Sequence, residues 1–208
     1  MICLFGGTFD PVHNGHLHAA RIAASHLSCR TRLVLAARPP HRPPPSASPE
    51  DRWAMLKSAC AGVPELIPDD SEISSPDDGF TVDTLDRVRR RYPDRPVFWV
   101  IGMDAFRYLR TWHRWREVFD LAHLLLLNRP GSDLDAPTRA IYERFRLDGT
   151  PSSLAGGILR VDAPMLDVSA SGIRKSLAED RPVSHLLPYG VQAYIRQHGL
   201  YVGDRATA

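Results

Sequence analysis

The stretch ICLFGGTFDPVHNGH, residues 2–16, decides the predicted fold. Its apolar beginning, Ile2 to Phe5, predicts a short buried strand, and Gly6 to Asn14 predicts a loop. A helix should follow from about Gly15. The apolar residues on the inward side of that helix are Leu17, Ala20, Ala24 and Leu27. A strand that passes through a glycine-rich loop into a helix indicates the first unit of an α/β fold.

Outward from this stretch, apolar runs alternate with amphipathic stretches, which is typical of a parallel sheet covered by helices. Further strands are predicted at residues 32–37, 96–102, 123–127 and 158–161, and the last of these should be the final strand of the sheet. One helix is predicted over residues 81–91. Another should begin at SPED, residues 48–51, which offers a serine N-cap, a proline at the first position and acids in the first turn.

The 208 residues are predicted to form one domain, residues 1–208. From Ser171 onward the chain should be helical in two segments that are broken near Pro182 and Pro188. We therefore predict an α/β fold with a Rossmann-like, doubly wound parallel sheet and helices on both of its faces. A small helical carboxyl-terminal part should occupy about residues 171–200.

A proline-dense segment, Arg38 to Pro49, holds six of the 18 prolines of the chain. Because it is too short to separate two domains convincingly, we interpret it as a stiff loop at the end of a strand. Open parallel sheets bind their ligands at that end, so this loop is expected to border a site.

The composition is that of an ordinary globular protein, with 43% hydrophobic and 24% charged residues. The formal net charge of +2 suits an anionic small-molecule substrate and is too weak to indicate a nucleic-acid partner. No apolar run approaches the roughly 18 residues of a membrane span, so no membrane partner is expected. Cys3, Cys29 and Cys60 form no CxxC pair, which disfavours a disulfide framework and a structural zinc site. We expect a cytoplasmic protein, and the sequence leaves a homo-oligomer open.

The loop GGTFDPVHNGH, residues 6–16, carries the strongest chemical signal. Its two glycines remove side chains where a backbone must approach a ligand closely. His16 lies near a helix N-terminus, where N–H groups and the helix dipole favour anions. His13 and His16 could direct both imidazoles to one phosphate cluster and stabilise the charge that grows during displacement at phosphorus. A metal site of His13, His16 and His18 is the alternative, but the spacing offers no nearby cysteine or acidic partner.

A second segment, VSASGIR at residues 168–174, makes chemical sense by itself. Ser169 or Ser171 can cap the helix that follows, and Arg174 should project from its first turn. Helix-end N–H groups, hydroxyls and a guanidinium together favour a polyphosphate. The alternative is an ordinary helix start with a solvated arginine.

The first motif resembles the GGTFDPVHxGH signature of the nicotinate-nucleotide adenylyltransferases, part of a nucleotidyltransferase group whose HxGH motif holds ATP phosphates. The resemblance covers nearly the whole chain. Further matching segments, in the family's order, are PPHR (39–42), GFTVDTL (79–85), IGMD (101–104), TW (111–112), NRPG (128–131) and VSASGIR (168–174). The departures are Met103, Ala170, Ser171 and Gly172, which put fine affinity rather than reaction class in doubt.

The resemblance implies transfer of AMP from ATP to nicotinate mononucleotide, giving nicotinate adenine dinucleotide and pyrophosphate, a step of NAD biosynthesis. Mg²⁺ would arrive bound to ATP, and no residue is implied as a metal ligand of the protein. The residues implied to neutralise the triphosphate are His16, His13 and Arg174. Those implied to line the ATP site are Gly7, Thr8, Phe9, Gly102, Asp104, Ser171 and Ile173. Those implied to receive the nicotinate nucleotide are Arg42, Thr81, Trp112 and Arg129.

Several alternatives stay open at this stage. The acceptor could be the nicotinamide nucleotide as well (dual specificity) or, less in keeping with the motifs, phosphopantetheine, and the protein could instead be a non-catalytic nucleotide sensor or a histidine-metal module. Asp104 could merely cap the next helix, and Trp112 could merely pack the core. The arginines at positions 87, 89, 90 and 91 are predicted to form a solvated helix end rather than a nucleic-acid patch.

Overall fold

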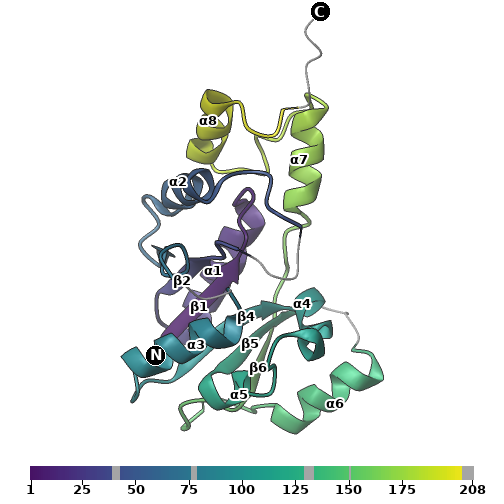
Figure 1. Cartoon of the computed structure of the whole chain (residues 1–208). Coiled ribbons are helices and arrows are strands. Elements are labelled where there is room, and N and C mark those ends of the chain that lie inside the picture. The colour runs from purple at the N-terminus through teal and green to yellow at the C-terminus, as the bar shows by residue number, and fades with distance from the viewer. Residues whose placement is uncertain (39–42, 76–78, 129–133, 150, 203–208) are drawn as a thin grey trace, which may run out of the picture.

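The computed structural model describes residues 1–38, 43–75, 79–128, 134–149 and 151–202. A six-stranded, entirely parallel sheet runs through the molecule in the order β3-β2-β1-β4-β5-β6 (Figure 1). The strands are β1 (Ile2–Gly7), β2 (Thr31–Leu35), β3 (Leu66–Asp69), β4 (Val97–Gly102), β5 (His123–Asn128) and β6 (Ile158–Asp162). The strand order reverses between β1 and β4, and ligands of open parallel sheets bind outside the carboxyl ends at such a reversal.

Helices connect the strands and cover both faces of the sheet (Figure 1). They are α1 (Asn14–Leu27), α2 (Pro49–Cys60), α3 (Thr81–Arg91), α4 (Met103–Arg107), the 3₁₀ helix η1 (Leu109–Thr111), α5 (Val118–Leu121), α6 (Ala136–Phe145), α7 (Ala170–Ala178) and α8 (Tyr189–His198). Within the described ranges, no helix is long and apolar enough to cross a membrane.

The core divides according to the two-residue period of the strands. On one face, Leu4 of β1 and Trp99 of β4 pack with Leu85 of α3. On the other face, Cys3 of β1 and Phe98 of β4 pack with side chains of α1. The sheet therefore has an apolar layer on each side, as in the predicted doubly wound fold, which the architecture confirms.

The last two helices lie at the end of the molecule occupied by α2 (Figure 1). Ile173 of α7 and Val191 of α8 are buried in the same cluster as Leu33 of β2 and Met55 of α2. The helical carboxyl-terminal part therefore shares its core with the sheet and with α2.

Most predicted elements are confirmed, and α3 occupies the predicted residues 81–91. Ser48 caps α2 as predicted, because its hydroxyl accepts a hydrogen bond from the Asp51 amide at 3.0 Å. The loop prediction was wrong at Gly6 and Gly7, which belong to β1 and pair with β2. Five elements of the structure were not predicted from the sequence: β3, α4, η1, α5 and α6.

The prediction of a solvated arginine cluster at the end of α3 was wrong for Arg89. Its guanidinium is partly buried and donates to main-chain carbonyls, with the Leu121 oxygen at 2.6 Å and the Leu154 oxygen at 2.9 Å. Arg90, one residue on, is exposed and pairs with Asp86. Side chains that follow each other on a helix point in different directions, so one arginine turns to the sheet edge and its neighbour to water.

Candidate functional site

The turn after β1 is shaped by glycine. A Cβ added to Gly7 would lie 2.7 Å from the ring of Phe9, and one added to Gly6 would collide with Trp99. Phe9 has a positive φ of 49°, and its ring is buried in the core. Gly7 therefore lets the Phe9 ring fold back over the end of the strand, and Gly6 makes room for the Trp99 ring of β4. Phe9, predicted to line the ATP site, contributes its ring to the core.

His13 and His16 are stacked on each other at the start of α1. Their ring centroids are 3.7 Å apart and the planes are inclined by 22°. His13 is the N-cap residue, and its amide donates to Nδ1 of His16 at 3.3 Å. Because this nitrogen accepts, a neutral His16 carries its proton on Nε2, where it can be donated to an anion. Burial lowers the pKa of His13 to about 4, which keeps its imidazole uncharged at neutral pH.

Gly15 brings the two predicted phosphate motifs together. A Cβ at this position would stand 2.6 Å from Cγ1 of Val168 and 3.1 Å from Nδ1 of His13. Any larger residue would push the segment before α7 away from α1 or displace the His13 ring. The spacing HxGH thus has a packing reason in this fold.

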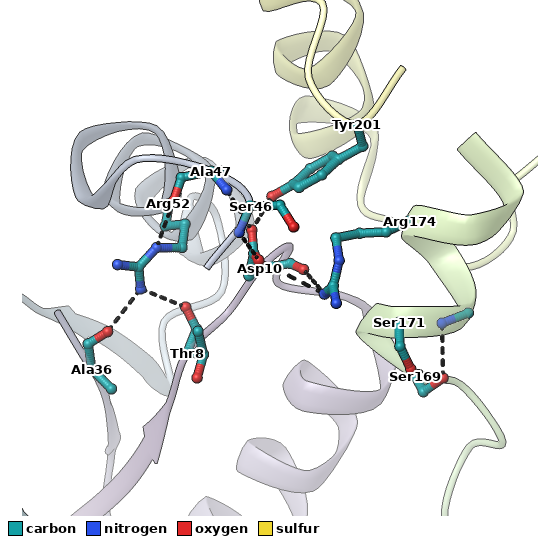
Figure 2. Close-up of polar contacts among 11 residues, drawn as sticks. Thr8, Asp10, Ala36, Ser46, Ala47, Arg52, Ser169, Ser171, Arg174 and Tyr201 are labelled. Carbon is teal, nitrogen blue, oxygen red and sulfur yellow. Dashed lines mark hydrogen bonds and ion pairs between the residues drawn. The ribbon is translucent and has the colours of Figure 1, made fainter. Parts of the chain in front are cut away.

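The start of α7 lies beside the first motif (Figure 2). Ser169 is the N-cap, and its hydroxyl accepts from the Gly172 amide at 3.1 Å, which confirms one of the two predicted capping residues. Ser171 lies in the first turn, with its hydroxyl 3.4 Å from that of Ser169. Ile173 is buried and anchors the turn to the core. Two serine hydroxyls are therefore presented at a helix N-terminus.

Arg174 reaches from α7 to the loop after β1. One nitrogen, Nη1, donates to the main-chain oxygen of Asp10 at 2.7 Å and lies 3.7 Å from its carboxylate oxygen Oδ2. This contact joins residues 164 positions apart in the sequence. The solvated-arginine alternative is therefore wrong, because the guanidinium is partly buried and held against the first motif.

Asp10 was not singled out in the sequence, yet it occupies the centre of the polar contacts in Figure 2. Its buried carboxylate accepts from the amides of Ser46 at 2.7 Å and Ala47 at 3.1 Å, and from the hydroxyl of Tyr201 at 2.7 Å. These donors meet at Asp10 only in the folded chain, since Ser46 and Ala47 lie 36 and 37 residues from it in the sequence and Tyr201 lies 191 residues away.

Arg52 was also missed. It is fully buried on α2, and it donates to the main-chain oxygens of Thr8 at 2.9 Å, Ala36 at 2.7 Å and Ala47 at 3.2 Å (Figure 2). A further nitrogen, Nη2, donates to the main-chain oxygen of Ala37 at 2.9 Å. Burial lowers the pKa of its guanidinium, and the charge of Asp10 opposes that shift. A signal existed, because the residue stands on the apolar side of its helix, with Met55 and Leu56 one turn further on.

On the other side of the strand reversal, β4 ends in an open turn. Gly102 is the N-cap of α4, it is exposed, and a Cβ added there would meet no described atom within 4 Å. Asp104 lies exposed in the first turn of α4, two residues after the N-cap position that Gly102 occupies. The capping alternative for Asp104 is therefore wrong, and its carboxylate faces solvent at the carboxyl end of β4.

The predicted nicotinate-nucleotide residues are only partly described. Thr81 is the first residue of α3, and Trp112 is half-buried against the core, as the packing alternative for it required. The neighbouring rings of Phe80 and His113 have centroids 4.4 Å apart, which places the segments of Thr81 and Trp112 side by side. Arg42 and Arg129 lie outside the described residues.

The site as a whole is built to receive a polyanion. It combines the N-termini of α1 and α7 with the imidazole of His16 and the guanidinium of Arg174. In the part of the chain that the structure describes, no group of three or more His, Cys, Asp or Glu side chains could hold a metal ion. The arrangement suits phosphate binding and stabilisation of negative charge at phosphorus.

Comparisons with known proteins identify the family and the fold. Residues 4–176 match the family described as Cytidylyltransferase-like. The "Probable nicotinate-nucleotide adenylyltransferase" of Pseudomonas fluorescens is 42% identical over 96% of both chains. The protein of the same name from Laribacter hongkongensis is also 42% identical, over 96% of this chain and 94% of its own. A nicotinic acid mononucleotide adenylyltransferase of Plasmodium falciparum, solved with NaAD, has a similar fold, with a TM-score of 0.74 at 16% identity over 96% of each chain.

Proposed function

This chain belongs to the nicotinate-nucleotide adenylyltransferase family of the cytidylyltransferase-like proteins, and we propose that it transfers AMP from ATP to nicotinate mononucleotide. The products are nicotinate adenine dinucleotide and pyrophosphate, and the reaction is a step of NAD biosynthesis. The observation that carries this proposal is the convergence of His16, Arg174 and two helix N-termini at the carboxyl end of β1.

The mechanism follows from the donors at this site. A phosphate oxygen of the mononucleotide attacks the α-phosphorus of ATP in line, the bond to the pyrophosphate oxygen breaks, and the electron pair leaves with pyrophosphate. The attacking oxygen is already anionic, so no strong general base is required. Rate enhancement comes from positioning and from donors aimed at the oxygens whose charge grows.

His16 is the central donor in this mechanism. With Nδ1 engaged by the His13 amide, its Nε2–H is directed to a phosphate oxygen. His13 stays neutral and holds the ring of His16 by stacking. Arg174 and Ser171 supply further donors to the triphosphate, with Gly7 and Thr8 offering the main chain of the turn.

Mg²⁺ is proposed to arrive with ATP rather than to be held by the protein. The donors at the site are N–H, hydroxyl and cationic groups, which suit phosphate oxygens and not a metal ion. The nearby carboxylate of Asp10 already accepts three hydrogen bonds and faces Arg174. When bound, the metal ion neutralises triphosphate charge and stabilises the leaving pyrophosphate.

The two nucleosides are proposed to bind on either side of the strand reversal. Asp104, with its exposed carboxylate after β4, suits the diol of the adenosine ribose, and Gly102 leaves room for it. Thr81, Trp112, Arg42 and Arg129 are proposed to receive the nicotinate nucleotide. In support, the segments of Thr81 and Trp112 lie side by side.

Two further properties complete the proposal. The chain acts as one domain, residues 1–208, which the core shared by α7, α8 and the sheet supports. It works in the cytoplasm, in keeping with the free thiols of Cys3, Cys29 and Cys60.

The test is product formation from ATP and Mg²⁺ with either nicotinate mononucleotide or its amide analogue, followed by chromatography. We expect the nicotinate dinucleotide to form much faster than NAD. Equal rates would change the assignment to dual specificity. A few contacts can favour a carboxylate over an amide by only about 1–3 kcal/mol of binding free energy. If neither dinucleotide forms, the enzymatic proposal is wrong.

A further inference from the structure

Tyr201 lies near the carboxyl-terminal end of the described chain, far in sequence from every motif, yet it contacts the phosphate site. Its hydroxyl donates to Oδ1 of Asp10 at 2.7 Å, across a separation of 191 residues. Its ring packs against the cluster that contains Phe9 and Val12 of the first motif. Figure 2 shows the phenol descending onto the Asp10 carboxylate, beside the Arg174 guanidinium.

The backbone at Tyr201 adds a second observation. Its φ is 61°, in the left-handed region that a residue with a large side chain rarely adopts. Such a conformation persists only where the surrounding contacts over-determine it, and these sites often serve function. Here the contacts are the packing of the partly buried ring and the hydrogen bond to Asp10.

The partners of Asp10 explain what the phenol can do. Oδ2 accepts from the Ser46 amide, and Oδ1 accepts from the Ala47 amide and from Tyr201. With these three donors in place, Arg174 bonds the main-chain oxygen of Asp10 at 2.7 Å and stays 3.7 Å from the carboxylate. In the part of the chain that the structure describes, one nitrogen, Nη1, binds the protein, which leaves the other N–H groups of the guanidinium for phosphate.

We propose that Tyr201 is a positioning residue of the ATP-phosphate site, which acts through Asp10 to keep the Arg174 guanidinium turned toward the triphosphate. This deepens the adenylyltransferase function proposed above and rests on it. Without the hydroxyl, the Asp10 carboxylate loses one hydrogen-bond donor, and the Arg174 guanidinium moves in to replace it. The ion pair closes, and ATP must then compete with Asp10 for the guanidinium.

The test is Tyr201→Phe, which keeps the packed ring and removes only the hydroxyl. The matched control is Tyr194→Phe on α8, because the Tyr194 hydroxyl donates to another carboxylate, that of Asp51, at 3.0 Å and away from the phosphate motifs. We expect the KM for ATP and the calorimetric Kd of ATP to rise about tenfold in Tyr201→Phe, as for loss of one hydrogen bond to a charged group. The kcat at saturating ATP and the KM for the mononucleotide should change less than twofold, and Tyr194→Phe should match the wild type in all four.

Stability and coupling separate positioning from packing. The melting temperatures of both tyrosine variants measure any loss of packing. We expect that loss to be similar in the two, so it cannot account for a loss of ATP affinity in Tyr201→Phe alone. In an Asp10→Asn background, Tyr201→Phe should add less than a twofold further change in ATP affinity, because the pathway is already interrupted. Full additivity with Asp10→Asn would overturn the inference, as would an unchanged Kd of ATP in Tyr201→Phe.

The two proposals fail in different ways. If the wild type binds ATP but makes no dinucleotide, the adenylyltransferase function is wrong, while the calorimetric comparison of the two tyrosine variants still decides the role of Tyr201. If the wild type makes dinucleotide and Tyr201→Phe has wild-type ATP affinity, only the positioning role is wrong.

Discussion

Two arginines bind main-chain carbonyls at opposite edges of the same sheet. Arg52 lies at the carboxyl edge and donates to oxygens just beyond β1 and β2, those of Thr8, Ala36 and Ala37 among them. Arg89 lies at the amino edge and donates to oxygens just ahead of β4, β5 and β6, including those of Arg95, Leu121 and Leu154.

The chemistry at the two edges is the same, but its consequence differs. Arg52 is fully buried and holds the turn that carries Asp10. Asp10 in turn is hydrogen-bonded by Arg174 and Tyr201. Arg89 is partly exposed, and the carbonyls that it binds lie in segments that lead into β4, β5 and β6. A guanidinium that binds several main-chain carbonyls therefore stabilises the fold. It matters for function only where those carbonyls belong to a ligand-binding turn.

The largest effect should come from a donor at the carboxyl edge. His16→Ala removes the proposed Nε2–H donor to the phosphates, and we expect kcat to fall by about 100-fold or more. The fold should stay intact with a loss of only about 1 kcal/mol in stability, since the ring accepts the His13 amide at the helix start. The matched control is His26→Ala in the last turn of the same helix, which should keep wild-type kcat. Near wild-type turnover in His16→Ala would remove this residue from the mechanism.

The comparison itself is tested by Arg52→Met and Arg89→Met. Arg52→Met leaves four carbonyls without their donor in a buried site, so we expect a loss of about 3 kcal/mol or more in the free energy of unfolding and a large fall in kcat/KM. Arg89→Met should cost about 1–3 kcal/mol and leave kcat/KM unchanged at a temperature where both variants are folded. Equal losses of activity in the two variants would contradict the functional difference between the edges.

Glu72 contrasts with both arginines, because one oxygen of its buried carboxyl lacks a hydrogen-bond partner among the described residues. Glu72 accepts from the Thr84 hydroxyl through Oε1, while Oε2 has no hydrogen-bond partner among the described residues. Burial raises the pKa of Glu72 to about 7, so the folded state holds a proton that the unfolded state releases near pH 4.5.

Stability should therefore fall as the pH rises from about 4.5 through 7. Glu72→Gln keeps an acceptor for Thr84 and removes the titration. Denaturant unfolding at pH 5 and pH 8 should show a gap in stability that is smaller in the variant by about 1–3 kcal/mol. An identical pH dependence in both proteins would show that Glu72 is charged in the folded state.

The smallest effect is expected at the exposed neighbour of Arg89. Arg90 pairs with Asp86 on the surface of α3, and Arg90→Ala should change the free energy of unfolding by less than about 0.5 kcal/mol. Comparison with Arg89→Met tests whether the two adjacent arginines contribute differently to the free energy of unfolding, as their surroundings indicate. A loss as large as that of Arg89→Met would mean that helix propensity, not carbonyl binding, governs both.

Local signals predicted much of the fold. The cap of α2 at Ser48 and the full extent of α3 depend on neighbouring residues, and both were predicted correctly. Other signals of the same kind went unused. Asp135, followed by Pro137 within the first turn, caps α6 by accepting from the Thr138 amide at 2.9 Å.

The features of the candidate site also fall into those that local sequence predicts and those that depend on contacts between distant residues. Local sequence signals suffice for the alternation of strands and helices, the glycine-rich turn after the first strand and the helix start that carries Arg174, because caps, periodicity and turn residues act within a few positions. Tertiary packing is what buries Arg52, bonds Asp10 to Tyr201 and sets Arg174 against the first motif. These contacts join residues 44, 191 and 164 positions apart, and packing of the whole sheet and its helices is what brings such distant groups within hydrogen-bonding distance.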